Sequence, residues 1–161
     1  MILYHGSNTV VNNIDINKCK PHKDFGRGFY LTSIESQAAI FARRIHERHG
    51  LIGKPTVNMF EFMPSEDSHL SILRFDKVDW NWAWFVLRNR YYKNIKETTH
   101  DIIIGPVGDD DMFRLFQLFV DHVISKEDVI RKMKYKKLND QYCFSSINAI
   151  NALVHVNHKI I

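Results

Sequence analysis

The sequence has no long apolar run, because no hydrophobic stretch approaches the ~20 residues that a helix needs to cross a bilayer. It also has no basic leader, since residues 1–4 already form a strand-like apolar segment. A conventional signal peptide is therefore not expected. We expect a cytoplasmic protein without a membrane partner.

Cysteine is scarce, and Cys19 and Cys143 stand alone without metal-ligand spacing. We expect two reduced thiols and no disulfide. The nine histidines are also poorly spaced for a metal, because His46 and His49 share a helix face without a recognisable pattern of cysteine or carboxylate partners. The sequence therefore predicts no metal cofactor.

Several catalytic motifs are missing. The chain has no phosphate-binding Walker loop, no Gly-x-Ser-x-Gly nucleophile motif, no internal repeat and no low-complexity tract. These absences argue against a P-loop nucleotide hydrolase, an α/β-hydrolase and a repeat protein.

The composition is typical of a globular protein, with 45% hydrophobic and 25% charged residues in 161. This length predicts a single domain, 1–161, with its own core. The net charge of +4 permits an anionic partner without requiring one. The excess of positive charge is concentrated in the segment Arg131 to Lys137. We favour a solvated helix face there over a contact with an acidic protein or a nucleic acid.

Hydrophobic periodicity predicts both helices and strands. Strands are expected near 57–63, 70–75, 100–106, 141–145 and 154–161, and helices over 34–49, 80–92, 112–120 and after Ser125. The acids Asp109, Asp110 and Asp111 are interpreted as helix-starting residues rather than metal ligands. The irregular alternation favours an α+β fold over a doubly wound parallel sheet.

The segment 24–32, Asp-Phe-Gly-Arg-Gly-Phe-Tyr-Leu-Thr, predicts a tight turn that leads into a strand. It fixes Tyr30 beside the turn, and the following helix can turn Phe41 back toward it. Two aromatic rings that bracket a space are suited to a flat ligand. Taken alone, however, the pattern is more typical of a hairpin and a core strand.

The N-terminal strand adds the sequence Tyr4-His5-Gly6-Ser7. Tyr-His-Gly-Ser, then Gly-x-Gly-Phe-Tyr-x-Thr, then paired alanines and an aromatic residue eleven positions after Tyr30 resemble the NAD-binding core of the ADP-ribosyltransferase superfamily. The resemblance is strongest to the branch of diphtheria toxin and the poly(ADP-ribose) polymerases. It covers roughly the first 45 residues and a weaker motif near the C-terminus, whereas the middle matches only loosely a group of small bacterial members.

This resemblance implies two small, mostly antiparallel sheets around an NAD cleft, with flanking helices. His5 would bind a ribose hydroxyl, the Gly6 backbone would bind the carboxamide, and Tyr30 and Phe41 would hold the nicotinamide ring. For Ser7 and Thr32, local strand-end bonds are favoured over direct contact with the ligand. The full implied set of NAD-contacting residues is His5, Gly6, Ser7, Gly28, Tyr30, Thr32 and Phe41.

The relatives carry a catalytic glutamate at the start of a late strand, and Gln141 matches that position here. The implied catalytic residues are therefore His5, Tyr30 and Gln141. A glutamine can accept a hydrogen bond from the ribose 2′-hydroxyl but lacks the charge that strengthens such a bond. Asp140, or an acid of 109–111, is a candidate auxiliary carboxylate.

The leading hypothesis is an enzyme that uses NAD as substrate and transfers ADP-ribose to a protein or nucleic acid. The resemblance further suggests the toxin of a toxin–antitoxin or phage-defence pair, with a small antitoxin protein as partner. Three alternatives stay open: an NAD glycohydrolase, an NAD- or ADP-ribose-binding module without chemistry, and a protein-interaction domain.

Overall fold

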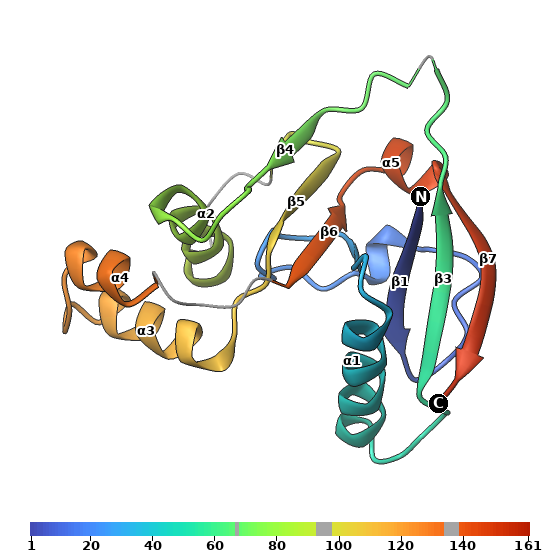
Figure 1. Cartoon of the computed structure of the whole chain (residues 1–161), viewed down its shortest axis with the longest axis horizontal. Coiled ribbons are helices and arrows are strands. Elements are labelled where there is room, and N and C mark those ends of the chain that lie inside the picture. Colours follow the sequence, from blue (N-terminus) through green and yellow to red (C-terminus); the bar gives the residue numbers. More distant parts are fainter. Residues whose placement is uncertain (67, 93–97, 134–138) are drawn as a thin grey trace.

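The computed structural model describes residues 1–66, 68–92, 98–133 and 139–161 (Figure 1). Within these ranges it is an α+β fold of five helices and two small open sheets, as the sequence predicts. The strands are β1 (Ile2–Ser7), β2 (Phe29–Leu31), β3 (Thr56–Phe62), β4 (Ile72–Arg74), β5 (Ile102–Pro106), β6 (Asp140–Phe144) and β7 (Leu153–Ile160). The helices are α1 (Glu35–Arg48), α2 (Trp80–Tyr91), α3 (Asp110–Val120), α4 (Lys126–Met133) and α5 (Ile147–Asn151), with one 3-10 turn, Ile16–Lys18.

The two sheets are mostly antiparallel. One has the order β1-β3-β7 and is antiparallel throughout, and the other has the order β2-β6-β5-β4, in which β4 and β5 run parallel. An isolated bridge between Tyr4 and Thr32 connects β1 to β2, with the two backbone N–H···O bonds at 2.8 and 2.9 Å. Among the described residues, this bridge provides the backbone pairing between the two sheets.

Each face of the four-stranded sheet is buried by a different layer. Its inner face contributes Phe29, Leu31 and Phe144 to a cluster shared with Leu3 and Phe60 of the other sheet. Its outer face is covered by α2, α3 and α4, which gather on one side of the molecule in Figure 1. Because strand side chains alternate between faces, Tyr30 lies on the outer face while its neighbours lie on the inner one.

The predicted helix starts are confirmed by their caps. Asp79 accepts from the backbone N–H of Trp82 at 3.0 Å, and Asp109 accepts from that of Met112 at 2.8 Å. Side-chain oxygens thereby satisfy donors that the first helical turn leaves unpaired. Strand β4 is shorter than the predicted 70–75, and most other boundaries differ by one or two residues.

Cys19 and Cys143 are both free thiols, as expected. None of the helices in the described ranges combines the length and apolarity that crossing a membrane requires.

Candidate functional site

The site is centred on the point where β1 and β2 separate. Beyond the Tyr4–Thr32 bridge, the Nδ1 atom of His5 lies 2.8 Å from the carbonyl oxygen of Tyr30. A carbonyl oxygen can only accept, so Nδ1 carries the proton. The imidazole therefore joins the two strands where their backbone pairing stops.

The surroundings of His5 favour its neutral form. Its ring centroid lies 4.3 Å from that of Phe29, and desolvation lowers the His5 pKa. The bond to Tyr30 opposes this shift, and the nearby Lys23 charge adds to it. Since Nδ1 holds the proton of a neutral ring, Nε2 is an acceptor, as a ribose hydroxyl requires.

We predict that acidification weakens this site. The pKa of His5 is lowered from 6.5, so below that pH the unfolded chain takes up a proton that the folded chain resists. The free energy of unfolding should therefore fall as the pH drops through 6.5, and less so in His5→Asn, which cannot titrate. Urea unfolding at several pH values measures this difference, and long-range ¹H–¹⁵N NMR reports the tautomer. Equal pH dependence in the two proteins would contradict the prediction.

Gly6 lets α1 lie directly against β1. A Cβ atom at Gly6 would meet the Ala42 backbone nitrogen at 2.7 Å, and the Ala38 carbonyl oxygen at even closer range. Both contacts are with backbone, which cannot move aside easily. The glycine predicted to contact a ligand therefore also has a packing role.

Phe41 lies on α1 outside this buried contact. Ala38 and Ala42 are buried, whereas Phe41 is 40% exposed and belongs to neither hydrophobic cluster. The ring is accessible, and its contact with nicotinamide stays a prediction.

Two glycines shape the turn before β2. Gly26 has φ of +86°, a conformation that residues with a Cβ rarely adopt. Gly28 permits close approach of β6, because its Cβ would lie 2.5 Å from the sulfur of Cys143 and 2.8 Å from the carbonyl oxygen of Phe144. The turn at Gly26 agrees with the interpretation of the sequence, whereas Gly28 is required for packing against β6 and its contact with NAD stays a prediction.

Tyr30 is anchored to this turn through its hydroxyl group. The hydroxyl donates to the carbonyl oxygen of Gly26 at 2.8 Å and accepts from the Phe25 N–H at 2.9 Å. Burial raises the pKa of Tyr30 well above its ordinary value, so the phenol stays protonated. These bonds hold the aromatic ring at a fixed position on the outer face of β2.

We predict different losses from two substitutions at this position. Tyr30→Phe keeps the ring and loses both bonds, which should cost about 1–3 kcal/mol of unfolding free energy. Tyr30→Ala also removes the ring. In addition to its loss of stability, this variant should bind NAD more weakly by ~1–3 kcal/mol, the range for a stacked aromatic. Urea unfolding and calorimetric NAD titration separate the two effects. Unchanged NAD affinity in folded Tyr30→Ala would exclude the stacking role.

Gln141 lies on β6, next to β2 and on the same sheet face as Tyr30. It is buried, and its Nε2 donates to Asp24 Oδ2 at 3.0 Å and to the Pro106 carbonyl oxygen at 3.1 Å. Asp24 is only 5% exposed and is paired with the Nε of Arg90 at 2.5 Å. Neither partner is evident from the sequence: Asp24 begins the 24–32 segment but gives no sign of a contact 117 positions away, and Arg90 belongs to no local motif.

The remaining predicted polar residues have structural partners. Asp140 Oδ1 accepts from the Thr32 hydroxyl at 2.6 Å and the Ser33 N–H at 2.9 Å, and Ser33 also donates to Oδ2. Ser7 accepts from the Thr9 N–H at 3.3 Å. The carboxylate that contacts Gln141 is Asp24, whereas Asp140 joins β6 to the start of α1.

A cavity of about 280 Å³ lies at the ends of β5 and β6. It is lined in part by Ile34, Arg74, Asp140 and Tyr142. Tyr142 follows Gln141 and faces the opposite side of the sheet, so this cavity adjoins the Gln141 strand without containing the Gln141 side chain.

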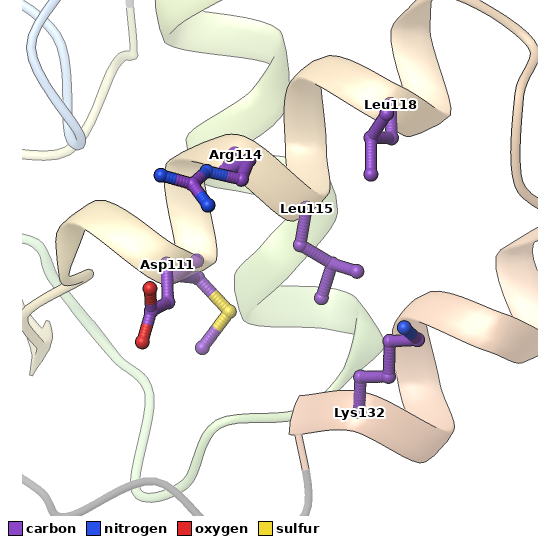
Figure 2. A pocket seen from close by; sticks show the side chains of 6 residues that line it. Asp111, Arg114, Leu115, Leu118 and Lys132 are labelled. Carbon is purple, nitrogen blue, oxygen red and sulfur yellow. The ribbon is translucent and has the colours of Figure 1, made fainter.

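A second cavity, of about 220 Å³, lies between α3 and α4, and Figure 2 shows Asp111 and Arg114 on one helix and Lys132 on the other. The auxiliary role of an acid at 109–111 stays a prediction. Arg131 pairs with Asp128 at 2.6 Å, while residues 134–137 of the predicted basic segment lie outside the described residues. No group of three or more potential metal-ligating side chains occurs in the part of the chain that the structure describes.

The fold and this site define a small α+β protein in which strands bearing a histidine, a tyrosine and a glutamine meet where two sheets join. The chain belongs to the DUF3990 family, described as proteins of unknown function, whose model matches residues 1–155. No curated protein and no solved structure matches the chain.

Proposed function

We propose that the chain is an NAD-dependent ADP-ribosyltransferase with the corresponding fold, and that it modifies a protein or a nucleic acid. The observation that carries this proposal is that the strands of His5, Tyr30 and Gln141 are neighbours in the fold. His5 bonds the backbone of Tyr30, and the strand of Tyr30 pairs with that of Gln141. These residues come from three distant segments, in the order that the sequence resemblance requires.

In this proposal NAD is the substrate, and each residue has a defined task. The Nε2 of His5 accepts a hydrogen bond from a ribose hydroxyl, which its neutral state permits. Tyr30 and Phe41 hold the nicotinamide ring between them, and the backbone of Gly6 binds the carboxamide. The backbone oxygen of Tyr30 is already bonded to His5, so substrate recognition relies on its ring.

The reaction breaks the bond between the ribose C1′ and the nicotinamide nitrogen. The electron pair of that bond neutralises the pyridinium nitrogen, so nicotinamide leaves uncharged while positive charge develops on the ribose. Gln141 accepts from the 2′-hydroxyl and orients the ribose as this charge forms. A lone pair of the acceptor then forms the new bond to C1′, and the acceptor releases its proton to solvent.

Because Gln141 is uncharged, a second candidate function is a module that binds NAD or ADP-ribose without catalysing a reaction. A carboxylate would stabilise the developing positive charge more strongly than an amide oxygen. An NAD glycohydrolase would use the same site with water as the acceptor.

Purified protein incubated with NAD, with and without cell lysate, distinguishes these functions. We expect nicotinamide release together with transfer of labelled ADP-ribose to a macromolecule of the lysate. Release without lysate identifies a glycohydrolase. Calorimetric NAD binding without release identifies the binding module, and absence of both binding and release rejects the proposal.

We propose the toxin of a toxin–antitoxin or phage-defence pair as the biological setting. An enzyme that consumes NAD or modifies macromolecules in the cytoplasm would harm its own host, so it requires a small inhibitory protein partner. The basic segment Arg131 to Lys137 is the candidate contact with an acidic partner or a nucleic-acid target, although Arg131 is also paired with Asp128.

A further inference from the structure

The buried carboxylate of Asp24 fixes which end of the Gln141 amide faces the protein interior. The Gln141 nitrogen donates to Asp24 Oδ2 and to the Pro106 carbonyl oxygen. A carboxylate and a carbonyl oxygen both accept and cannot donate. Turning the amide over would bring its oxygen against two other oxygens, so the nitrogen stays inward and Oε1 is directed away from Asp24.

The second carboxylate oxygen and the backbone carbonyl of Asp24 are also hydrogen-bonded. Its Oδ1 is paired with the Nε of Arg90 at 2.5 Å, while the Arg90 guanidinium lies 3.7 Å from the Phe113 ring centroid. The Asn89 amide donates to the Asp24 carbonyl oxygen at 3.2 Å. Residues at the end of α2 therefore hold Asp24 in place from the side opposite Gln141.

We propose that Asp24 is a positioning residue for the reaction, which orients Gln141 so that Oε1 can accept from the ribose 2′-hydroxyl. This inference rests on the proposed function. A hydrogen bond to a carboxylate also polarises the amide, because bonded groups strengthen one another in a chain. A carboxylate, itself paired with Arg90, thus lies next to the uncharged amide at position 141.

The same contact explains why an amide, rather than a carboxylate, occupies position 141. In Gln141→Glu an ionised oxygen would lie against Asp24 and the Pro106 carbonyl. Two carboxylates at this distance cannot both ionise readily, so one pKa rises. Once the pair holds one proton, the carboxylic acid reproduces the donor and acceptor pattern of glutamine.

A double-mutant cycle at positions 24 and 141 tests this inference through nicotinamide release as a function of pH. Asp24→Asn should lower kcat about tenfold while KM for NAD stays within about threefold, because its amide no longer enforces one orientation of Gln141. Gln141→Glu should be weakly active at neutral pH and gain activity as the pH falls. In the double variant Asp24→Asn/Gln141→Glu, the side chain at position 24 donates and the one at position 141 accepts. The double variant should therefore be about tenfold more active than Gln141→Glu at neutral pH, and its activity should no longer rise as the pH falls.

Asp128→Asn is the matched control, because Asp128 is also paired with an arginine, at 2.6 Å, but lies on α4. It should leave kcat and its pH profile unchanged. An active wild type with unchanged kcat in folded Asp24→Asn overturns the inference, as does a double variant no better than Gln141→Glu. A wild type that binds NAD but releases no nicotinamide rejects the proposed function itself and the inference with it, so the two failures are distinguishable.

Discussion

Gln141→Ala should lower nicotinamide release by ~10²–10³-fold while NAD affinity changes little. This is the range for loss of one preorganised hydrogen bond that matters mainly in the transition state. The side chain is buried beside Asp24 and Pro106, so it is held in one orientation before substrate binds. Steady-state release of nicotinamide and calorimetric NAD titration measure the two quantities separately.

Gln117→Ala is a close control for that substitution. Gln117 also donates through Nε2 to an aspartate, Asp121, at 2.9 Å, but it lies on α3 and is exposed. Its turnover should equal that of the wild type. Full activity in a folded Gln141→Ala protein would mean that another group orients the ribose.

Local residue patterns were sufficient to predict the parts of the site that depend on short segments. The glycine turn, the position of Tyr30 beside it and the caps at Asp79 and Asp109 all follow from neighbouring residues, and the structure contains each of them. The pairing of β2 with β6 was not predicted, because spacing alone does not specify which strands pair.

The partners of Gln141 could not be predicted in this way. Asp24 and Gln141 are 117 positions apart, and Asp24 and its other partner, Arg90, are 66 positions apart. Neither contact leaves a periodic signal in the sequence. The sequence instead suggested Asp140 as an auxiliary carboxylate because it is adjacent in sequence. Strand alternation turns the side chains of residues 140 and 141 to opposite faces, which is why the nearest acid in the chain is not the one in contact.

Ser7 and Gly6 illustrate a related limit. A motif shared with a family identifies positions, but it does not separate contacts with a ligand from contacts that build the fold. In the structure Gly6 is required by the helix packed on β1, and Ser7 accepts a local backbone bond. A substitution at Gly6 would therefore disturb packing whether or not NAD binds there.

The largest stability loss should follow from Trp82→Ala, at about 3–5 kcal/mol, the usual range for truncating a buried tryptophan. Trp82 is fully buried on α2, and its Nε1 donates at 3.1 Å to the Pro106 carbonyl oxygen that also accepts from Gln141. Because folded domains are stable by only ~5–15 kcal/mol, the variant should be partly unfolded at moderate temperature. Urea unfolding monitored by circular dichroism measures the loss.

Two companion substitutions show whether that loss comes from the buried ring. Trp84→Ala removes the same side chain from a position on α2 that is 41% exposed, so it should cost about 1 kcal/mol or less. Trp82→Phe keeps most of the ring and loses the hydrogen bond to Pro106, so it should lower the free energy of unfolding less than Trp82→Ala. It should also lower turnover, because the Pro106 carbonyl oxygen accepts from Gln141 as well. Equal losses at Trp82 and Trp84 would contradict the burial argument, since only Trp82 lies within the cluster that covers the face of the sheet bearing Tyr30 and Gln141.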